Sequence, residues 1–152
     1  MAFRASQIKV ADAFSNICAI AFGTSQFLQS QRAPMTAASI PASTPVGIVA
    51  TLASRIASLD AAVASVDSAA LQIYAQAQVN DPNYNPAAEY SAMRSAIIAV
   101  GTSIMSIFPK DVNGYLLYQT FDANGNLVMR TFTAAQVASV VTLMDTAVSA
   151  IG

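Results

Sequence analysis

The sequence predicts a mainly α protein, a bundle of about four helices with one β-hairpin before the C-terminal helix, in a single domain over residues 1–152. Apolar residues recur at steps of three and four in four long segments, as they do on one face of an α-helix. Two short β-rich segments flank a turn sequence, and a helix-capping sequence follows directly. A single domain of this length can bury roughly two thirds of the surface of its unfolded chain.

The first predicted helix covers about residues 6–31. Gly23 weakens its middle, and Cys18 is interpreted as a small buried hydrophobic residue rather than a reactive thiol. The apolar stripe of this helix consists of Val10, Phe14, Ile17, Cys18, Ala21, Phe22 and Leu28.

Residues 33–45 follow with three prolines among serines and threonines, which predicts an extended linker. Such a strip can lie against a neighbouring subunit, but a plain linker is the favoured interpretation.

The second predicted helix, about residues 46–78, has the spacing of a coiled-coil seam. Arg55 and Asp60 flank the seam five residues apart, an offset at which the charges of parallel neighbours meet. The seam faces either another helix of its own chain, which is favoured, or a second copy. In the second case the interface candidates are Leu52, Ile56, Leu59, Val63 and Val66, with Arg55 and Asp60 beside them. The stripe consists of Leu52, Ile56, Leu59, Val63, Val66, Ala70, Ile73 and Ala77.

The third predicted helix covers about residues 86–108. Asn85 is its expected N-cap, Pro86 its first residue, and Pro109 ends it. Asn113-Gly114 then turns the chain toward the hairpin. The apolar stripe of this helix consists of Tyr90, Met93, Ile97, Val100, Ile104 and Ile107.

The hairpin is predicted over residues 115–132, with its turn at residues 122–126. Thr133 and Gln136 form a capping box for the last helix, about residues 134–151. Side chains alternate along a strand, and both faces of the first strand are largely apolar or aromatic. We therefore expect one face to contact the bundle and the other a neighbour. The interface candidates on this strand are Leu116, Tyr118 and Thr120.

The composition predicts a protein that works in contact with others. Apolar residues make up 55% of the chain, charged residues only 10%, and the net charge is -1. A monomer would have little charge to keep it apart from its neighbours, so we expect assembly into a homo-oligomer or a membrane partner. The longest unbroken apolar runs fall far short of the ~20 residues that span a bilayer, which argues against the membrane. Asp12 interrupts the first apolar segment, and no signal peptide is expected.

The chain has no histidine, the usual general base and commonest metal ligand. Its eight carboxylates are scattered, and neither Lys9 nor Lys110 lies in a catalytic motif, so we expect no enzyme, cofactor or metal. The segment from Asp122 begins like a calcium loop, but Leu127 replaces the required glycine and Thr133 the twelfth-position glutamate. The seven basic residues form no run, which argues against sequence-specific nucleic-acid binding.

The C-terminal sequence FDANGNLVMRTFTAAQVASVVTLMDTAVSAIG resembles the end of small structural proteins of tailed bacteriophages. The remaining Ala- and Ser-rich helical bundle is similar in outline to head-to-tail connector or adaptor proteins. The resemblance implies a noncatalytic virion component, made in the host cytoplasm, that forms a multi-copy ring and contacts the portal or other neck and tail proteins. Three alternatives remain: another capsid or tail protein, a cytoplasmic assembly chaperone or helical interaction module, and a small membrane-associated lysis protein.

Overall fold

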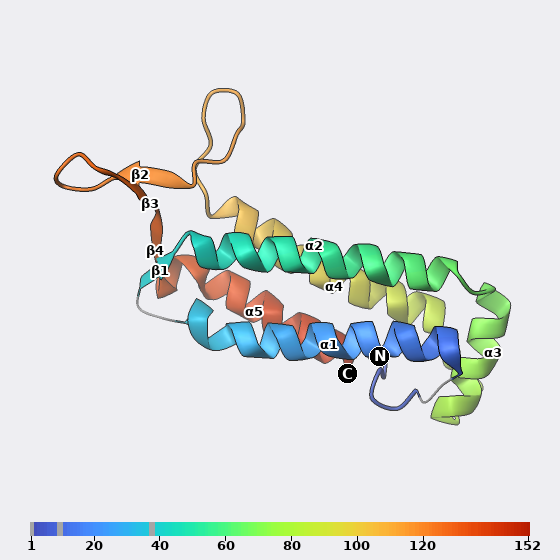
Figure 1. Cartoon of the computed structure of the whole chain (residues 1–152). Helices are drawn as coiled ribbons and strands as arrows, with labels where there is room; N and C mark the ends of the chain where they lie inside the picture. Colours follow the sequence, from blue (N-terminus) through green and yellow to red (C-terminus); the bar gives the residue numbers. More distant parts are fainter. Residues whose placement is uncertain (1, 9–10, 37–38) are drawn as a thin grey trace.

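The computed structural model describes residues 2–8, 11–36 and 39–152; Lys9 and Val10, considered above, lie outside these ranges, as do residues 37–38 of the expected linker. Within the described residues the chain forms five helices and four short strands (Figure 1). In chain order these are α1 Asp12–Met35, β1 Ser39–Pro41, α2 Ser43–Ala64, α3 Ser68–Val79, α4 Pro86–Ser106, β2 Gln119–Phe121, β3 Leu127–Met129, β4 Thr131–Thr133 and α5 Ala134–Ile151.

Four of the helices form the bundle, which confirms the predicted fold class. Helices α1, α2, α4 and α5 alternate in direction, and α3 crosses one end while the β-structure projects from the other (Figure 1). Helix α1 contacts α2 and α5, and α4 contacts the same two helices. The core between them contains side chains with no more than 1% exposure, among them Leu28, Leu59, Met93, Ile97, Ile104, Met144 and Ile151.

The predicted bounds of the first helix were wrong at both ends. Helix α1 begins at Asp12 rather than near residue 6, because residues 3–5 form a strip along the end of α5. In this strip the amide of Phe3 donates to the carbonyl oxygen of Ala150 at 2.9 Å. At its other end α1 continues through Pro34 to Met35, whose fully buried side chain anchors the last turn in the core. The expected linker is therefore shorter.

The second predicted helix is two helices. Helix α2 ends at Ala64, and Asp67 takes an extended conformation and caps α3, its Oδ1 accepting a hydrogen bond from the amide of Ala70 at 3.0 Å. The apolar period continues across this break, which is why the pattern alone predicted one helix. In α3 the apolar residues that continue this period face water, and Ile73 among them is 70% exposed.

Helices α4 and α5 confirm the predicted caps. The side chain of Asn85 accepts a hydrogen bond from the amide of Ala88 at 3.1 Å, and Pro86 opens α4, which ends at Ser106. Thr133 and Gln136 form the capping box of α5, and this helix has the bounds predicted for it.

The hairpin differs from the prediction because the chain makes two tight turns, at Asp111 and at Asp122. After the turn at Asp111, residues 115–117 run back alongside residues 109–111. There the amide of Leu117 donates to the carbonyl oxygen of Pro109 at 2.8 Å. Only β2 and β3 pair across the second turn, and β4 pairs instead with β1, inside the segment that was predicted to be a linker. We call residues 109–130 the arm, because they project beyond the end of the bundle (Figure 1).

Candidate interaction surfaces

The arm exposes an unusual amount of apolar surface. Along residues 115–121 the side chains alternate strictly between exposed and half-buried, as expected for an extended strand. The outward set includes Tyr115, Leu117 and Phe121, and Leu127 and Met129 of β3 are also exposed. Isolated apolar residues on a surface are common, but a concentration of them on a projecting segment indicates a contact site.

The face of the hairpin predicted as an interface lies toward its own chain. Leu116 and Tyr118 are half-buried and pack against the core of their own chain, and Thr120 is half-buried on the same side. The ring of Tyr118 meets that of Phe108 edge to face, with 4.9 Å between centroids. Phe108 in turn packs on buried Phe132, so these rings fasten the base of the arm to the bundle.

Each turn of the arm carries a carboxylate that organises the backbone. Oδ1 of Asp122 accepts hydrogen bonds from the amides of Asn124 and Asn126, both at 2.9 Å. Asp111 holds its turn in the same way. Gly125 and Gly114 supply the positive φ that each turn requires. Because these bonds use Oδ1, the second oxygen of each carboxylate has no hydrogen-bond partner in the part of the chain that the structure describes.

The first five residues of the seam predicted for the second helix face their own chain, whereas the part of the seam in α3 is exposed. Leu52 and Leu59 are buried in the bundle core, while Ile56, Val63 and Val66 are half-buried against it. These five residues form part of the internal packing. The alternative favoured by the sequence, a seam within one chain, therefore describes α2.

Asp60 is also committed within the chain. Its two carboxylate oxygens accept hydrogen bonds from Nε and Nη2 of Arg94 on α4, each at 2.9 Å, and Oδ1 accepts another from the hydroxyl of Tyr90. The hydrogen bond from Arg94 is the main reason why the pKa of Asp60 lies below its usual value. Burial, followed by the bond to Asp60, raises the pKa of Tyr90. Asp60 is therefore paired with Arg94 of its own chain, and the expected contact between Arg55 and Asp60 of parallel neighbours stays a prediction.

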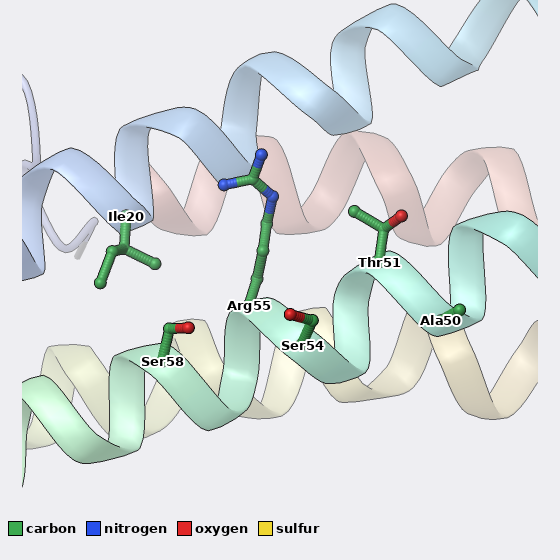
Figure 2. A pocket seen from close by; sticks show the side chains of 6 residues that line it. All are labelled: Ile20, Ala50, Thr51, Ser54, Arg55 and Ser58. Carbon is green, nitrogen blue, oxygen red and sulfur yellow. The ribbon is translucent and has the colours of Figure 1, made fainter.

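Arg55 occupies a groove between α1 and α2. Its side chain extends from α2 toward α1, with Ser54 and Ser58 on either side of it (Figure 2). The guanidinium carbon lies 5.8 Å from the ring centroid of Phe27. Its Nε is buried and has no hydrogen-bond partner among the described residues. The groove has a volume of about 460 Å³ and is lined by Ile20, Ala50, Thr51, Ser54, Arg55 and Ser58.

A second groove, between α2 and α4, is almost entirely apolar. Its volume is about 380 Å³, and Ile98 on its rim is 40% exposed. Gly101 in its wall has open space where a Cβ would stand, so the groove is not closed by the packing of its own chain.

No group of acidic, histidine or cysteine side chains suited to a metal is present in the described ranges. Cys18 is buried, as predicted, and burial raises its pKa to about 11. At neutral pH this thiol is therefore protonated and a poor nucleophile. Helices α2 and α5 are long and apolar enough to cross a bilayer by length and mean hydropathy, a property that core helices of soluble bundles share.

No family model, curated protein or solved structure matches the chain.

Proposed function

We propose that this protein is a noncatalytic structural subunit of a virion, a multi-copy component of the neck or head-to-tail connector that acts through its interfaces. The observation that carries the proposal is the projecting arm and its exposed apolar side chains. A two-stranded hairpin is marginally stable by itself, and one that leaves apolar side chains in water gains free energy when a partner covers it. The resemblance of residues 121–152 to tailed-phage structural proteins supplies the virion assignment.

The arm and the bundle have separate roles in this proposal. The bundle carries the internal core and holds the base of the arm through Phe108, Tyr118 and Phe132. The arm reaches the neighbouring copy, or a portal, neck or tail protein, beyond the end of the bundle. A domain with one projecting segment can form a ring in which the arm of each subunit binds the adjacent subunit.

The proposal is tested first by removing the apolar surface of the arm. We expect the double variant Phe121→Ser/Leu127→Ser to keep its helix content by circular dichroism but to lose self-association in sedimentation velocity. Burying these two side chains is worth about 2 kcal/mol or more, so association should weaken roughly 30-fold. The matched control is Ile73→Ser, because Ile73 on α3 is as exposed as Phe121, at 70%. Equal weakening by the control variant would show that the arm is not the contact surface.

The virion assignment needs its own measurement. Mass spectrometry of purified particles should detect the chain at several copies per particle. An assembly chaperone or free interaction module would be absent from the particles, and a lysis protein would sediment with host membranes. Either result would contradict the proposal.

A further inference from the structure

Arg55 differs from the other arginines of the bundle. Arg4, Arg32 and Arg94 each form an ion pair with an aspartate of their own chain, at 3.7, 3.0 and 2.9 Å respectively. Arg55 has no carboxylate partner in the described part of the chain, and its buried Nε has no acceptor there, which is also true of the Nε of Arg130 in the arm. The positive charge of Arg55 therefore has no opposite charge beside it within the described chain.

The position of Arg55 is built into the packing of two helices. A Cβ at Gly23 of α1 would lie 3.1 Å from Nη1 of Arg55, so the glycine makes room for the guanidinium. The ring of Phe27 adds a cation–π contact on the same helix. These contacts hold a planar fork of donors in a groove that also contains the hydroxyls of Ser54 and Ser58 (Figure 2). Such a fork matches a carboxylate, which can accept two of its hydrogen bonds.

We propose that this groove binds the carboxylate of Asp122 from the arm of a second copy. Asp122 stands at the tip of the β2–β3 hairpin, and its Oδ2 is unused within the described chain. Phe121 and Leu127, which flank the turn, are exposed. In the proposed contact they would cover the side chain of Ile20, which lines the groove. The negative charge of Asp122 then complements the positive charge of Arg55.

This contact joins two different surfaces of the same chain. Each copy offers its arm to one neighbour and its groove to the other, which is a heterologous arrangement that closes into a ring or continues as a filament. The inference rests on the proposed function and adds the residue that receives the arm.

A double-mutant cycle on self-association tests the inference. Arg55→Gln removes the charge, and Asp122→Asn removes the other charge while its side-chain oxygen can still organise the turn. We expect each single variant to weaken association about tenfold or more, as close interfacial charge pairs do. The double variant should self-associate about as strongly as the single variant that associates less. Sedimentation equilibrium of the full chain at several concentrations gives the three ratios, and circular dichroism confirms that each variant is folded.

Asp111→Asn is the matched control, because Asp111 organises the other turn of the arm through the same pattern of bonds. It should leave association near that of the wild type. The inference is wrong if the losses from Arg55→Gln and Asp122→Asn multiply to about a hundredfold, or if Arg55→Gln changes nothing. If Phe121→Ser/Leu127→Ser abolishes association while Arg55→Gln has no effect, the proposed function stands and only the inferred receptor groove fails.

Discussion

At the scale of single residues, the charged side chains show what the sequence could not reveal. Arg55 and Asp60 lie close together in the chain, and their spacing suggested one shared contact. In the structure Asp60 pairs with Arg94, which lies 34 residues away on α4, and Arg55 turns to the opposite neighbour, α1. Periodicity tells which side of a helix a residue occupies, but not which helix covers that side. Gly23 is a related case, because its role as a space for Arg55 depends on a helix far along the chain.

The pair of Asp60 and Arg94 predicts a pH-dependent contribution to stability. The folded-state pKa of Asp60 lies below its ordinary value, so the folded state favours the charged carboxylate. This stabilisation is fully present above the unfolded pKa of about 3.9 and is lost as the pH falls through the folded pKa. Asp60→Asn should therefore lower Tm at pH 7, and the difference from the wild type should shrink as the pH falls below about 4.

Both side chains are about 40% exposed, which keeps the effect small. We expect a Tm difference of up to about 3 °C at pH 7, measured by thermal melts in low salt. Adding Arg94→Met to Asp60→Asn should produce little further loss, because the pair is already broken. A difference that persists unchanged at pH 2.5 would contradict the assignment.

At the scale of secondary-structure elements, the sequence predicted correctly those features that depend only on residues close together in the chain. The caps of α4 and α5 were predicted because each involves residues within three positions of one another. The break between α2 and α3 was missed although Asp67 is a strong N-cap residue, since the apolar period of α2 continues past it. The two turns of the arm carry the same Asp-x-Asn-Gly pattern, and only pairing partners distant in sequence decide how far each hairpin extends.

Asp67 should therefore be a stability determinant of α3. Replacing it with alanine removes the acceptor for the amide of Ala70 and should cost about 1 kcal/mol, or roughly 2–4 °C in Tm. Asp67→Asn keeps a side-chain acceptor and should remain close to the wild type. Chemical denaturation followed by circular dichroism measures both variants. Equal losses for the two variants would mean that charge, and not the cap bond, is what α3 requires.

At the scale of the whole molecule, the sequence predicted the fold class but not the division of apolar surface. Leu59 and Ile97 in the core and Phe121 and Leu127 on the arm are equally apolar, yet the first two are fully buried and the last two are exposed. The hydrophobicity of a side chain shows that its burial is favourable in free energy. It does not show whether residues of the same chain or of another chain bury it. The apolar interface candidates of the second predicted helix and of the inner arm face illustrate this, because they are buried or half-buried against their own bundle.

The same division predicts that the tip of the arm can be removed without harm to the bundle. The amide of Arg130 donates to the carbonyl oxygen of Tyr118 at 2.9 Å, which is the bond that closes a two-residue hairpin turn. Replacing residues 119–129 with Asn-Gly therefore joins two positions that already face each other. None of the removed side chains is buried, and the pairing of β1 with β4 remains.

We expect this shortened chain to melt within about 2 °C of the wild type, because less than 1 kcal/mol of folding free energy should be lost. It should also remain monomeric at concentrations where the wild type associates, since both the apolar tip and Asp122 are gone. Differential scanning calorimetry and sedimentation velocity measure the two quantities on the same sample. A large drop in Tm would mean that the tip supports the core, and continued association would place the contact elsewhere on the bundle. The combination of unchanged stability and lost association is expected only if the arm tip serves other molecules rather than its own fold.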